Sequence, residues 1–492
     1  MKKPMQSSAG VETYEEPYRP QLHFTPESQW MNDPNGMVYY EGEYHLFYQY
    51  HPYSRQWGPM HWGHAVSEDM FAWKHLPIAL APDELGMIFS GSVVVDWEDS
   101  SGFFDGEDGL VAVYTSAKGD FQQQSIAYSV DRGRTWTKYE GNPVIPNPGK
   151  IDFRDPKVFY HDDSARWVMV LAAGQEVMFY TSEDLKTWEF ASVFGAEYGA
   201  HGGVWECPDL LAFYVPGEEN SKWVLQVDIG DGAAAGGSGG QYFLGNFDGK
   251  VFTADTAPED VQWIDYGKDY YATQSFSDIP EMDGRRIWLA WMSNWQYANE
   301  VPTEPWRSAM SLPREVNVIK KENGRFQLTQ LPAAEMEAYT GDIFIEKSVE
   351  IMQTTKQIIC EQPSTPFKLE VSIPLDKKQP ATFELFDNAD APGCEVKVNA
   401  EAGTISFDRA KMKMSSFHKD FPAVTTAPFD KSREMLKLLF VVDRSSVEIF
   451  INDGEQTMCN LILPENQSNY YISGKGSSEI HLKGEVMHSV WK

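Results

Sequence analysis

The stretch WMNDPNG, residues 30–36, is a turn-forming sequence that lies between strand-like segments. Asn, Asp, Pro and Gly favour sharp turns, so we expect the backbone to bend there and to present Asp33 at a defined angle. The segments that follow, 37–40 and 44–50, are rich in the Tyr, Val and Phe residues that favour β-strands. A carboxylate held at a kinked strand end suits a catalytic nucleophile, although an ordinary Asx-Pro turn has the same sequence. The motif alone leaves both interpretations open.

Short polar turns followed by a tryptophan recur along the chain. Strand-like runs broken by Gly, Pro, Asn and Asp dominate from residue 20 onward, which predicts an all-β chain. A hairpin that recurs at intervals is typical of the blades of a β-propeller. Three Ser-x-Asp turns have this form: 67–69 with Trp73, 129–131 with Trp136, and 182–184 with Trp188.

Five polar motifs follow a similar spacing. They contain Asp33, Ser90, Asp155, Glu206 and Tyr270, and successive members are 51 to 65 residues apart. Five units of that length predict a five-bladed β-propeller. If each motif lies on the innermost strand of its blade, residues far apart in the sequence meet at one central funnel. This convergence predicts an active site there.

The rhythm of aromatic turns ends after residue 315. Residues 331–339, LPAAEMEAY, read as a short helix, and the segments beyond them alternate like strands joined by hairpin turns. We therefore predict a propeller catalytic domain over residues 18–330, a linker with a short helix over 331–344, and a β-sandwich over 345–492. The C-terminal part shows no catalytic pattern, so its expected role is to buttress the propeller.

The composition limits the kinds of partner. The chain has 492 residues and a formal net charge of −31, and its length suits two domains with a large core. The negative charge argues against nucleic acids and anionic membranes as partners, and it disfavours polyanionic substrates. The sequence holds 16 Trp and 23 Tyr. Such rings stack on sugars, although all-β cores use them as well.

The four cysteines, Cys207, Cys360, Cys394 and Cys459, show no CxxC spacing. This pattern argues against a disulfide scaffold and against a zinc site. Residues 1–20 lack an apolar segment, and no apolar run is long enough to span a membrane. We expect a cytoplasmic protein for the sequence as written; the alternative is a secreted protein whose signal peptide has been removed. The oligomeric state stays open.

Three acids, Asp33, Asp155 and Glu206, suit glycoside hydrolysis. A retaining mechanism needs one carboxylate as nucleophile and a second, protonated carboxyl as general acid and then base, about 5 Å apart. A third carboxylate can orient ring hydroxyls. Glu206 lies between Trp205 and a Cys-Pro pair, so desolvation should raise its pKa, as a general acid requires. Asp33 lies among amide and turn N–H groups and should remain ionised.

Five motifs together resemble glycoside hydrolase family 32, the β-fructofuranosidases: WMNDPNG (30–36), FSGS (89–92), FRDP (153–156), WECPD (205–209) and VDRSSVEIFINDGE (442–455). The resemblance covers nearly the whole chain from residue 20 onward and implies a five-bladed propeller followed by a β-sandwich. It implies that Asp33 is the nucleophile, Glu206 the acid/base and Asp155 the transition-state stabiliser, with no cofactor. It also implies a fructose-binding pocket lined by Asn32, Gln49, Trp57, Phe89, Ser90, Arg154 and Trp295.

Two further segments, 236–243 and 291–297, look most like those of secreted bacterial levanases and exo-acting fructan hydrolases. The plant cell-wall invertase pattern, an Asp close to a Lys, is not reproduced, since Asp231 has no nearby Lys. The resemblance therefore implies a retaining exo-β-fructosidase that hydrolyses terminal fructose from levan, inulin or sucrose. A fructosyltransferase with the same fructosyl-enzyme intermediate and a non-catalytic fructan-binding propeller are the alternatives.

Other patterns favour structural roles. His61 and His64 are three apart on a strand and face opposite sides, which predicts packing and no metal site. The glycine-rich residues 230–240 lack a following Gly-Lys-Ser/Thr, so they predict a mobile rim loop rather than a phosphate site. Residues 105–109 lack calcium-loop spacing and predict a surface turn. Cys207 is expected to be a buried neighbour that tunes Glu206 and not a nucleophile, because no histidine partner is evident.

Overall fold

Almost all of the regular structure is β-sheet in the computed structural model, which describes residues 14–351, 355–375, 381–388, 392–465, 470–476 and 479–491. The prediction of an all-β chain is confirmed. Within these ranges the helices are short 3-10 turns: η1 Asp162–Ser164, η2 Ala298–Glu300, η3 Ala334–Tyr339 and η4 Lys413–Phe417. None of these helices is long and apolar enough to cross a membrane.

Residues 29–332 form five sheets, which together are called the five-sheet unit here. The first sheet contains β1 Gln29–Tyr40, β2 Glu43–His51, β3 His61–Ser67, β4 Lys74–Leu80 and β20 Trp306–Arg307, and the second contains β5 Met87–Asp96, β6 Gly109–Lys118, β7 Phe121–Ser129 and β8 Thr137–Lys138. The third contains β9 Phe153–His161, β10 Arg166–Ala173, β11 Val177–Ser182 and β12 Glu189–Phe194. The fourth contains β13 Trp205–Phe213, β14 Lys222–Ile229, β15 Gly239–Phe247, β16 Phe252–Ala254 and β17 Gln262–Trp263. The fifth contains β18 Tyr271–Ser275, β19 Arg286–Met292, β21 Ala309–Met310, β22 Arg314–Lys320 and β23 Phe326–Pro332.

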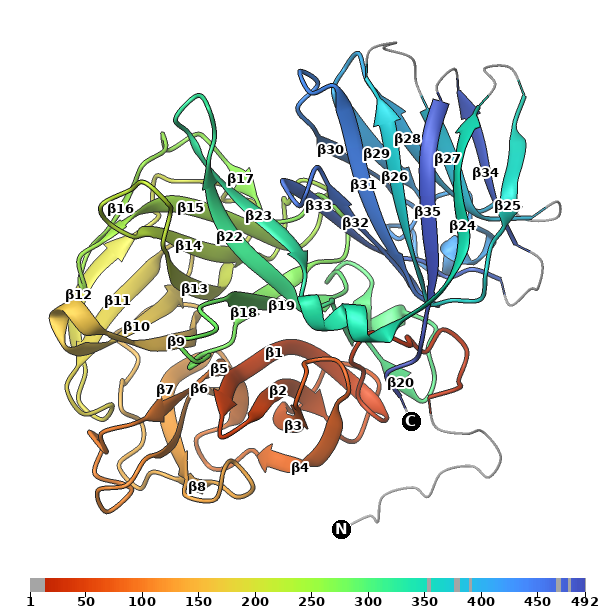
Figure 1. The fold of residues 1–492 in the computed structure, drawn as a ribbon. Coiled ribbons are helices and arrows are strands. Elements are labelled where there is room, and N and C mark those ends of the chain that lie inside the picture. Colours follow the sequence, from red (N-terminus) through yellow and green to blue (C-terminus); the bar gives the residue numbers. More distant parts are fainter. Residues whose placement is uncertain are drawn as a thin grey trace.

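The innermost strands of the five sheets contact one another in a ring. β1 contacts β5, the contacts continue through β9 and β13 to β18, and β18 contacts β1 again. The sheets therefore surround one centre, as Figure 1 shows. β20 pairs in parallel with the start of β1, so a late segment of the chain completes the first sheet.

Each innermost strand is irregular at the place where its motif lies. Register shifts fall within residues 31–34 of β1, 88–91 of β5, 154–157 of β9, 206–209 of β13 and 271–274 of β18. A bulge bends a strand and changes the direction of a side chain. The turn-forming residues of the motifs thus break the pleat at equivalent points around the ring.

The Ser-x-Asp turns are held by their own side chains. In the first, Ser67 Oγ donates to Asp69 Oδ1 at 2.9 Å, and the tryptophan that follows donates its indole N–H to a carbonyl of the same turn. The turns at 129–136 and 182–188 repeat both contacts. The recurrence read from the sequence therefore reflects one turn structure used three times.

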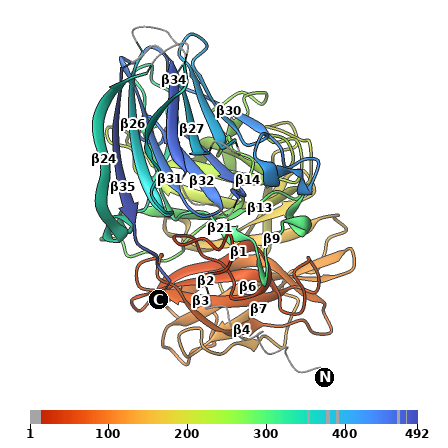
Figure 2. The same ribbon diagram turned by 90° about the vertical axis from the view of Figure 1, so that its right-hand side faces the viewer.

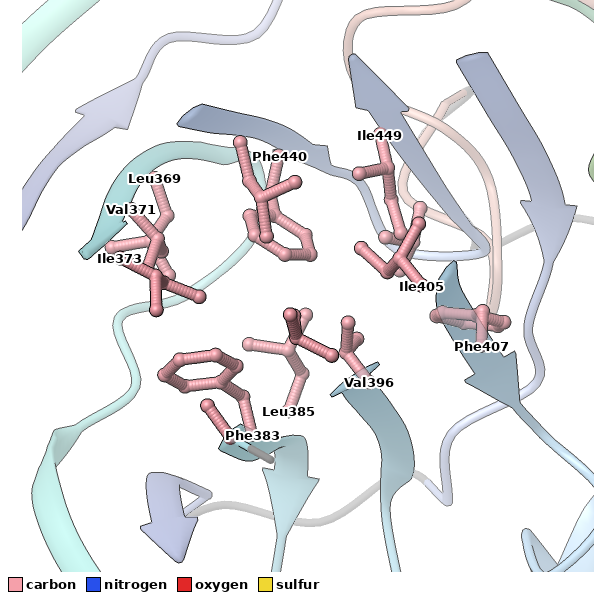
Figure 3. Close-up of a cluster of buried hydrophobic side chains, with 14 of the residues drawn as sticks. Leu369, Val371, Ile373, Phe383, Leu385, Val396, Ile405, Phe407, Phe440 and Ile449 are labelled. Atoms are coloured by element: carbon pink, nitrogen blue, oxygen red, sulfur yellow. The ribbon is translucent and has the colours of Figure 1, made fainter. Parts of the chain in front are cut away.

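The C-terminal residues form two six-stranded sheets that pack face to face as a β-sandwich. One sheet contains β24 Thr340–Glu350, β35 Glu479–Met487, β26 Phe367–Pro374, β31 Met435–Val442, β32 Ser446–Ile451 and β33 Gln456–Leu461, in that order. The other contains β25 Gln357–Glu361, β34 Tyr471–Gly476, β27 Ala381–Asp387, β28 Cys394–Asn399, β29 Thr404–Asp408 and β30 Val424–Pro428. Alternate residues of both sheets meet in one hydrophobic core, shown in Figure 3, which includes Leu369, Val371, Phe440, Phe383, Leu385 and Val396.

A short connection joins the five-sheet unit to the sandwich. β23 ends at Pro332, β24 begins at Thr340, and η3 lies between them with Met336 buried. The short helix expected here is therefore a 3-10 turn. Figure 2 shows the sandwich standing on one side of the five-sheet unit. Its Phe450 and Leu461 belong to hydrophobic clusters that the five sheets also build, so the two parts share a core.

Candidate active site

Asp33 lies buried in the bulge of β1. Its Oδ2 accepts a hydrogen bond from Ser90 Oγ at 2.6 Å, and its Oδ1 accepts one from Asn32 Nδ2 at 3.1 Å. Trp30 Nε1 donates to the Asn32 oxygen at 2.7 Å and so orients that amide. Burial raises the pKa of Asp33, whereas the hydrogen bonds from Ser90, Asn32 and Cys207 lower it. The amide donor expected from the sequence is present, but burial outweighs the hydrogen bonds and leaves the pKa of Asp33 above its usual value, opposite to the effect expected from the N–H donors alone.

Asp155 lies on β9 with a backbone φ of 62°, in the left-handed region that non-glycine residues rarely adopt. The Cys207 amide donates to Asp155 Oδ2 at 3.0 Å. Burial raises the pKa of Asp155 to about 7; Arg154 opposes this rise, and the charges of Glu206 and Asp33 add to it. This carboxyl therefore binds a proton near neutral pH, which the sequence did not predict.

Glu206 lies on β13 between two donors. Arg154 Nη2 donates to its Oε1 at 2.7 Å, and the Tyr271 hydroxyl donates to its Oε2. Burial raises the pKa of Glu206, Arg154 lowers it, and the charge of Asp33 raises it further. The prediction that desolvation raises this pKa is confirmed. Arg154 Nε also lies 3.8 Å from Asp155 Oδ2, so the same guanidinium interacts with both the Glu206 and the Asp155 carboxyl.

Cys207 connects two of the acids. Its Sγ lies 3.6 Å from Asp33 Oδ2 and 3.7 Å from Asp155 Oδ2. Burial raises the pKa of the thiol well above its usual value, so the thiol stays protonated and can donate to a carboxylate. Asp33, Asp155 and Glu206 therefore converge on one site, as their spacing predicts. Cys207 is the expected buried neighbour, and the acids that its sulfur contacts are Asp33 and Asp155.

Five of the seven residues predicted to bind substrate lie against the acids or their neighbours. Three of them, Asn32, Ser90 and Arg154, donate hydrogen bonds to the acids. Phe89 and Trp295 pack against the hydrophobic cluster that contains Trp30, Cys207 and Tyr271. The rings of Trp295 and Trp30 stack with centroids 6.0 Å apart. These residues thus surround the acids with donors and aromatic surface.

The other two predicted residues, Gln49 and Trp57, lie next to Phe89. Gln49 Nε2 donates to the Ile88 carbonyl at 3.0 Å. Trp57 is 41% exposed and meets the Phe89 ring edge to face at 6.1 Å. An exposed indole beside a partly buried ring suits the outer margin of the site, and the binding role of both residues stays a prediction.

The fifth motif residue is Tyr271, not the predicted Tyr270. Tyr271 begins β18 and donates to Glu206, whereas the Tyr270 ring lies beneath the Arg314 guanidinium, with the centroid 4.0 Å from it. The prediction for Tyr270 is therefore wrong by one residue. Adjacent side chains of a strand face opposite sides, so spacing alone could not choose between two neighbouring tyrosines.

Asp228 is a buried carboxyl that sequence reasoning missed. It lies opposite Glu206 in the pairing of β13 and β14, and its Oδ2 accepts the Thr273 amide at 2.9 Å. Burial raises the pKa of Asp228 well above its usual value, and the charges of Asp33 and Glu206 act in the same direction. Burial and the neighbouring charges therefore favour the protonated form of this carboxyl beside the site. Its surroundings in the sequence, LQVDIG (225–230), carry no functional signal.

The remaining patterns are structural. His64 Nε2 lies 3.1 Å from His45 Nδ1, whereas His61 Nδ1 lies 3.0 Å from the Pro59 carbonyl, so the two predicted packing residues have separate partners. No group of three or more His, Cys, Asp or Glu that could hold a metal ion occurs within the described ranges. Residues 105–107 lie exposed in a surface turn, as predicted.

Known proteins resemble this chain over nearly its whole length. The family model described as "Glycosyl hydrolases family 32 N-terminal domain" matches residues 23–332. The model described as "Glycosyl hydrolases family 32 C terminal" matches residues 335–486. A levanase from Bacillus subtilis (strain 168) is 50% identical over 483 residues, which make up 97% of this chain and 71% of that protein.

Solved structures agree with these matches. The crystal structure of an exo-inulinase from Aspergillus awamori has a TM-score of 0.90 at 35% identity and covers 97% of this chain and 100% of its own. A β-fructofuranosidase from Schwanniomyces occidentalis, complexed with fructosyl-erythritol, has a TM-score of 0.86 at 31% identity over 98% of this chain and 100% of its own. Sequence and structure thus match through both the five-sheet unit and the sandwich, and the chain belongs to glycosyl hydrolase family 32.

Proposed function

We propose that this glycoside hydrolase is a retaining exo-β-fructosidase that releases terminal β-D-fructofuranosyl residues from levan, inulin-type fructans and sucrose. The observation that carries the proposal is the contact of the Cys207 sulfur with Asp33 and Asp155, which, with Glu206 next in the chain, gathers three carboxyls in one site. The names of a similar levanase and a similar exo-inulinase support fructans as substrates. The fructosyl ligand in a similar structure supports recognition of fructose.

The proposed reaction has two steps: a covalent fructosyl-enzyme forms in the first and is hydrolysed in the second. Asp33 attacks the anomeric carbon of the terminal fructose while Glu206 gives its proton to the departing oxygen, which leaves a fructosyl ester on Asp33. Glu206 then takes a proton from water, and the water oxygen displaces the Asp33 carboxylate from the same carbon. Fructose leaves with retained configuration, and both carboxyls return to their starting states.

The neighbouring groups suit these roles. Ser90 and Asn32 each hold one oxygen of Asp33, which fixes the direction of the nucleophile. Asp155 is proposed to accept hydrogen bonds from fructose hydroxyls, which strengthen as positive charge develops on the ring. Arg154 keeps the half-buried Glu206 carboxyl and the buried Asp155 carboxyl close together by pairing with Glu206 and lying near Asp155.

The proposed architecture is a closed five-bladed β-propeller with its catalytic residues at the centre. The ring of contacts from β1 to β18, and the pairing of β20 with β1, support closure. The predicted bounds are 18–330 for the propeller domain, 331–344 for the linker and 345–492 for the sandwich domain; because β23 ends at Pro332 and β24 begins at Thr340, we assign the connection itself to residues 333–339. The shared hydrophobic clusters support the sandwich as a buttress of the propeller.

Product analysis on three substrates tests the proposal. The protein is incubated with levan, inulin and sucrose side by side, and free fructose without intermediate oligosaccharides is the expected product of each. Asp33→Ala is the control, and it should release fructose at a rate lower by several orders of magnitude. Longer fructosides formed at high sucrose would instead indicate a fructosyltransferase. Binding of levan without release of fructose would contradict the proposal and indicate a binding propeller.

A further inference from the structure

We propose that Arg409 of the sandwich is a positioning residue for the acid/base carboxyl, because it fixes, through Asp269, the segment from which Tyr271 donates to Glu206. The inference rests on the proposed role of Glu206. It assigns to the sandwich a part in catalysis that a passive buttress would not have.

The sandwich holds this segment by its outermost strand. β33 ends one sheet of the sandwich, and residues 265–269 of the five-sheet unit lie along its free edge. The Tyr266 amide donates to the Thr457 carbonyl at 2.8 Å, and the Asp269 amide donates to the Cys459 carbonyl at 3.0 Å. Hydrogen bonds of this kind fix a backbone in register as an added strand does.

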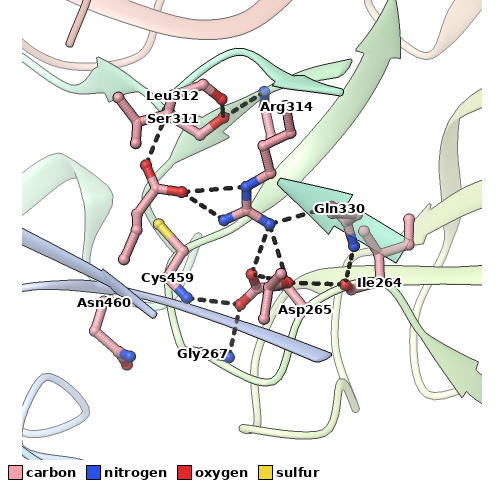
Figure 4. A network of polar contacts seen from close by, with 12 residues as sticks. Ile264, Asp265, Gly267, Ser311, Leu312, Arg314, Gln330, Cys459 and Asn460 are labelled. Carbon is pink, nitrogen blue, oxygen red and sulfur yellow. Dashed lines mark hydrogen bonds and ion pairs between the residues drawn. The ribbon is translucent and has the colours of Figure 1, made fainter. Parts of the chain in front are cut away.

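Asp265 secures the start of the same segment, as Figure 4 shows. Its Oδ1 accepts the Cys459 amide at 2.8 Å and the Gly267 amide at 2.7 Å, and its Oδ2 pairs with Arg314 Nη1 at 2.9 Å. Arg314 in turn pairs with Glu448 of the sandwich at 2.6 Å. The segment is therefore anchored to the sandwich at its first residue as well as along its length.

Arg409 secures the end of the segment. Its Nη1 donates to Asp269 Oδ2 at 2.6 Å and to the Leu461 carbonyl at 2.7 Å, and its Nη2 donates to the Tyr297 hydroxyl at 2.8 Å. The guanidinium lies over the Phe421 ring, 3.8 Å from the centroid. Both Arg409 and Asp269 are fully buried, so loss of either partner leaves an uncompensated buried charge.

Tyr271 lies two residues beyond this anchor. On its other side, Ala272 has a φ of 57°, which a non-glycine residue adopts only when its surroundings enforce it. The Thr273 amide is then held by Asp228 Oδ2 at 2.9 Å. Tyr271 thus lies between the anchor at Asp269 and a strained bulge. A shift of that anchor would move the hydroxyl relative to Glu206.

The expected consequence is a change in how firmly Glu206 holds its proton. A hydroxyl that donates to a carboxylate stabilises the ionised form and lowers the pKa, so a misplaced Tyr271 should raise the pKa of Glu206. The titratable and charged groups around Glu206 are Asp33, Asp152, Arg154, Asp155, Cys207, Asp228 and Tyr271. Of these, Tyr271 is the one that adjoins the segment anchored by Arg409.

The test measures kcat/KM on sucrose against pH. Arg409→Gln and Tyr271→Phe should each move the basic limb upward by about half to one pH unit, and Arg409→Lys should restore part of the wild-type position. In the double variant, Arg409→Gln should add no further shift to that of Tyr271→Phe. Asp269→Asn provides a second variant if Arg409→Gln fails to fold. It should show the same shift.

A matched control separates positioning from stability. Asp443→Asn disturbs another buried ion pair at the same interface, with His23, and should lower the melting temperature without moving the basic limb. Arg409 and Asp269 variants that lose stability but keep the wild-type limb would overturn the inference, as would an Arg409 shift that persists in the Tyr271→Phe background. The Glu206→Ala variant distinguishes a failure of the role proposed for Glu206 from a failure of the inference about Arg409. If the basic limb survives in that variant, the proposed acid/base role of Glu206 fails; if it vanishes while the Arg409 variants shift nothing, this inference alone fails.

Discussion

Arg154 Nη2 lies 2.7 Å from Glu206 Oε1, so the proposed acid/base is paired with a fixed cation. Burial favours the protonated carboxyl, whereas the guanidinium favours the ionised one. Asp155, 3.8 Å from Arg154 Nε, is subject to the same opposition, and its pKa is raised to about 7. One guanidinium therefore lies beside two carboxyls, and the charge of Glu206 contributes to the raised pKa of Asp155.

Glu206→Ala should remove the basic limb of the pH profile. In the wild type, kcat/KM should form a bell whose basic limb lies above the usual pKa of a glutamate, because burial raises the pKa of Glu206 and activity is lost as this carboxyl gives up its proton. The variant should still form the fructosyl-enzyme from an activated aryl fructoside, which needs no protonation to leave. Added azide should then release fructosyl azide of retained configuration.

An unaltered basic limb, or no effect of azide, would remove Glu206 from its role. Asp209, close by in the chain, is a poor substitute because its Oδ2 accepts the Ser275 amide at 2.7 Å and lies 3.4 Å from Lys157 Nζ. Asp155 would then be the carboxyl to test.

Asp33→Ala should lower kcat by roughly four orders of magnitude or more, with a smaller change in substrate binding, because the covalent step is lost. Steady-state kinetics on sucrose measure both effects. Ser90→Ala, which removes one hydrogen bond to Asp33 and leaves the carboxylate, serves as the control and should lower kcat far less. Comparable losses in the two variants would show that orientation, and not nucleophilic attack, is the contribution of Asp33.

Asp155→Asn should lower kcat by about 10²- to 10³-fold, because an interaction that strengthens in the transition state is lost while the shape is kept. The change is read from kcat and KM on levan and sucrose. A change confined to KM would mean that Asp155 binds the ground state and the transition state equally, which contradicts its proposed role.

Cys207→Ala should move the acidic limb of kcat/KM to higher pH. The Cys207 thiol is one of the donors that lower the pKa of Asp33, so its removal lets burial raise that pKa further, and the nucleophile is lost at a higher pH. Cys394→Ala deletes another fully buried thiol, within the sandwich, and is the matched control. An equal shift in both variants would show a general effect of lost stability.

His23→Gln should remove a pH dependence of stability. Burial alone would lower the pKa of His23, but Asp443 at 2.8 Å and Glu448 at 3.0 Å raise it to about 9. Because this folded-state pKa exceeds the unfolded value of about 6.5, the stabilisation is complete below pH 6.5 and is lost as the pH rises through about 9.

Urea unfolding of the wild type between pH 6 and 10 should therefore show a midpoint that falls over this interval. The His23→Gln variant should be less stable at pH 6 and should lack the fall. His481→Gln, at an exposed histidine of the sandwich, should keep it. A fall that survives in His23→Gln would assign the pH dependence to another group.

The sequence was sufficient for the three acids because their motifs carry both a turn and a carboxylate at a regular interval. Regular spacing places Asp33, Asp155 and Glu206 on equivalent strands, and the turn residues explain the bulges that redirect them. The same spacing failed at the fifth motif. A bulge shifts the alternation of side chains by one residue, so Tyr270 and Tyr271 could be distinguished only in three dimensions.

Arg409 and Asp228 carried no signal at all. Arg409 pairs with Asp269, which lies 140 residues earlier; Asp269 precedes the tyrosines of the fifth motif, but nothing in that motif indicates an arginine partner in the sandwich. Asp228 lies in an apolar strand. From the sequence alone a single Asp in such a strand is expected to be exposed, because the strand that pairs with it is not known. Long-range pairing of this kind depends on the docking of whole sheets, which local patterns do not record.

The pairing of residues 265–269 with β33 also covers an edge strand of the sandwich that could otherwise pair with another chain. A sheet that ends in a strand with free N–H and C=O groups is a template for pairing with other chains. In the intact protein the Tyr266 and Asp269 amides donate hydrogen bonds to carbonyls of β33. In a sandwich produced alone, β33 would be uncovered beside Cys459 and Leu461, which are buried in the intact protein, and edge-to-edge association is the expected outcome. Residues 265–269 of the five-sheet unit therefore cover the edge at which the sandwich could pair with another copy of itself.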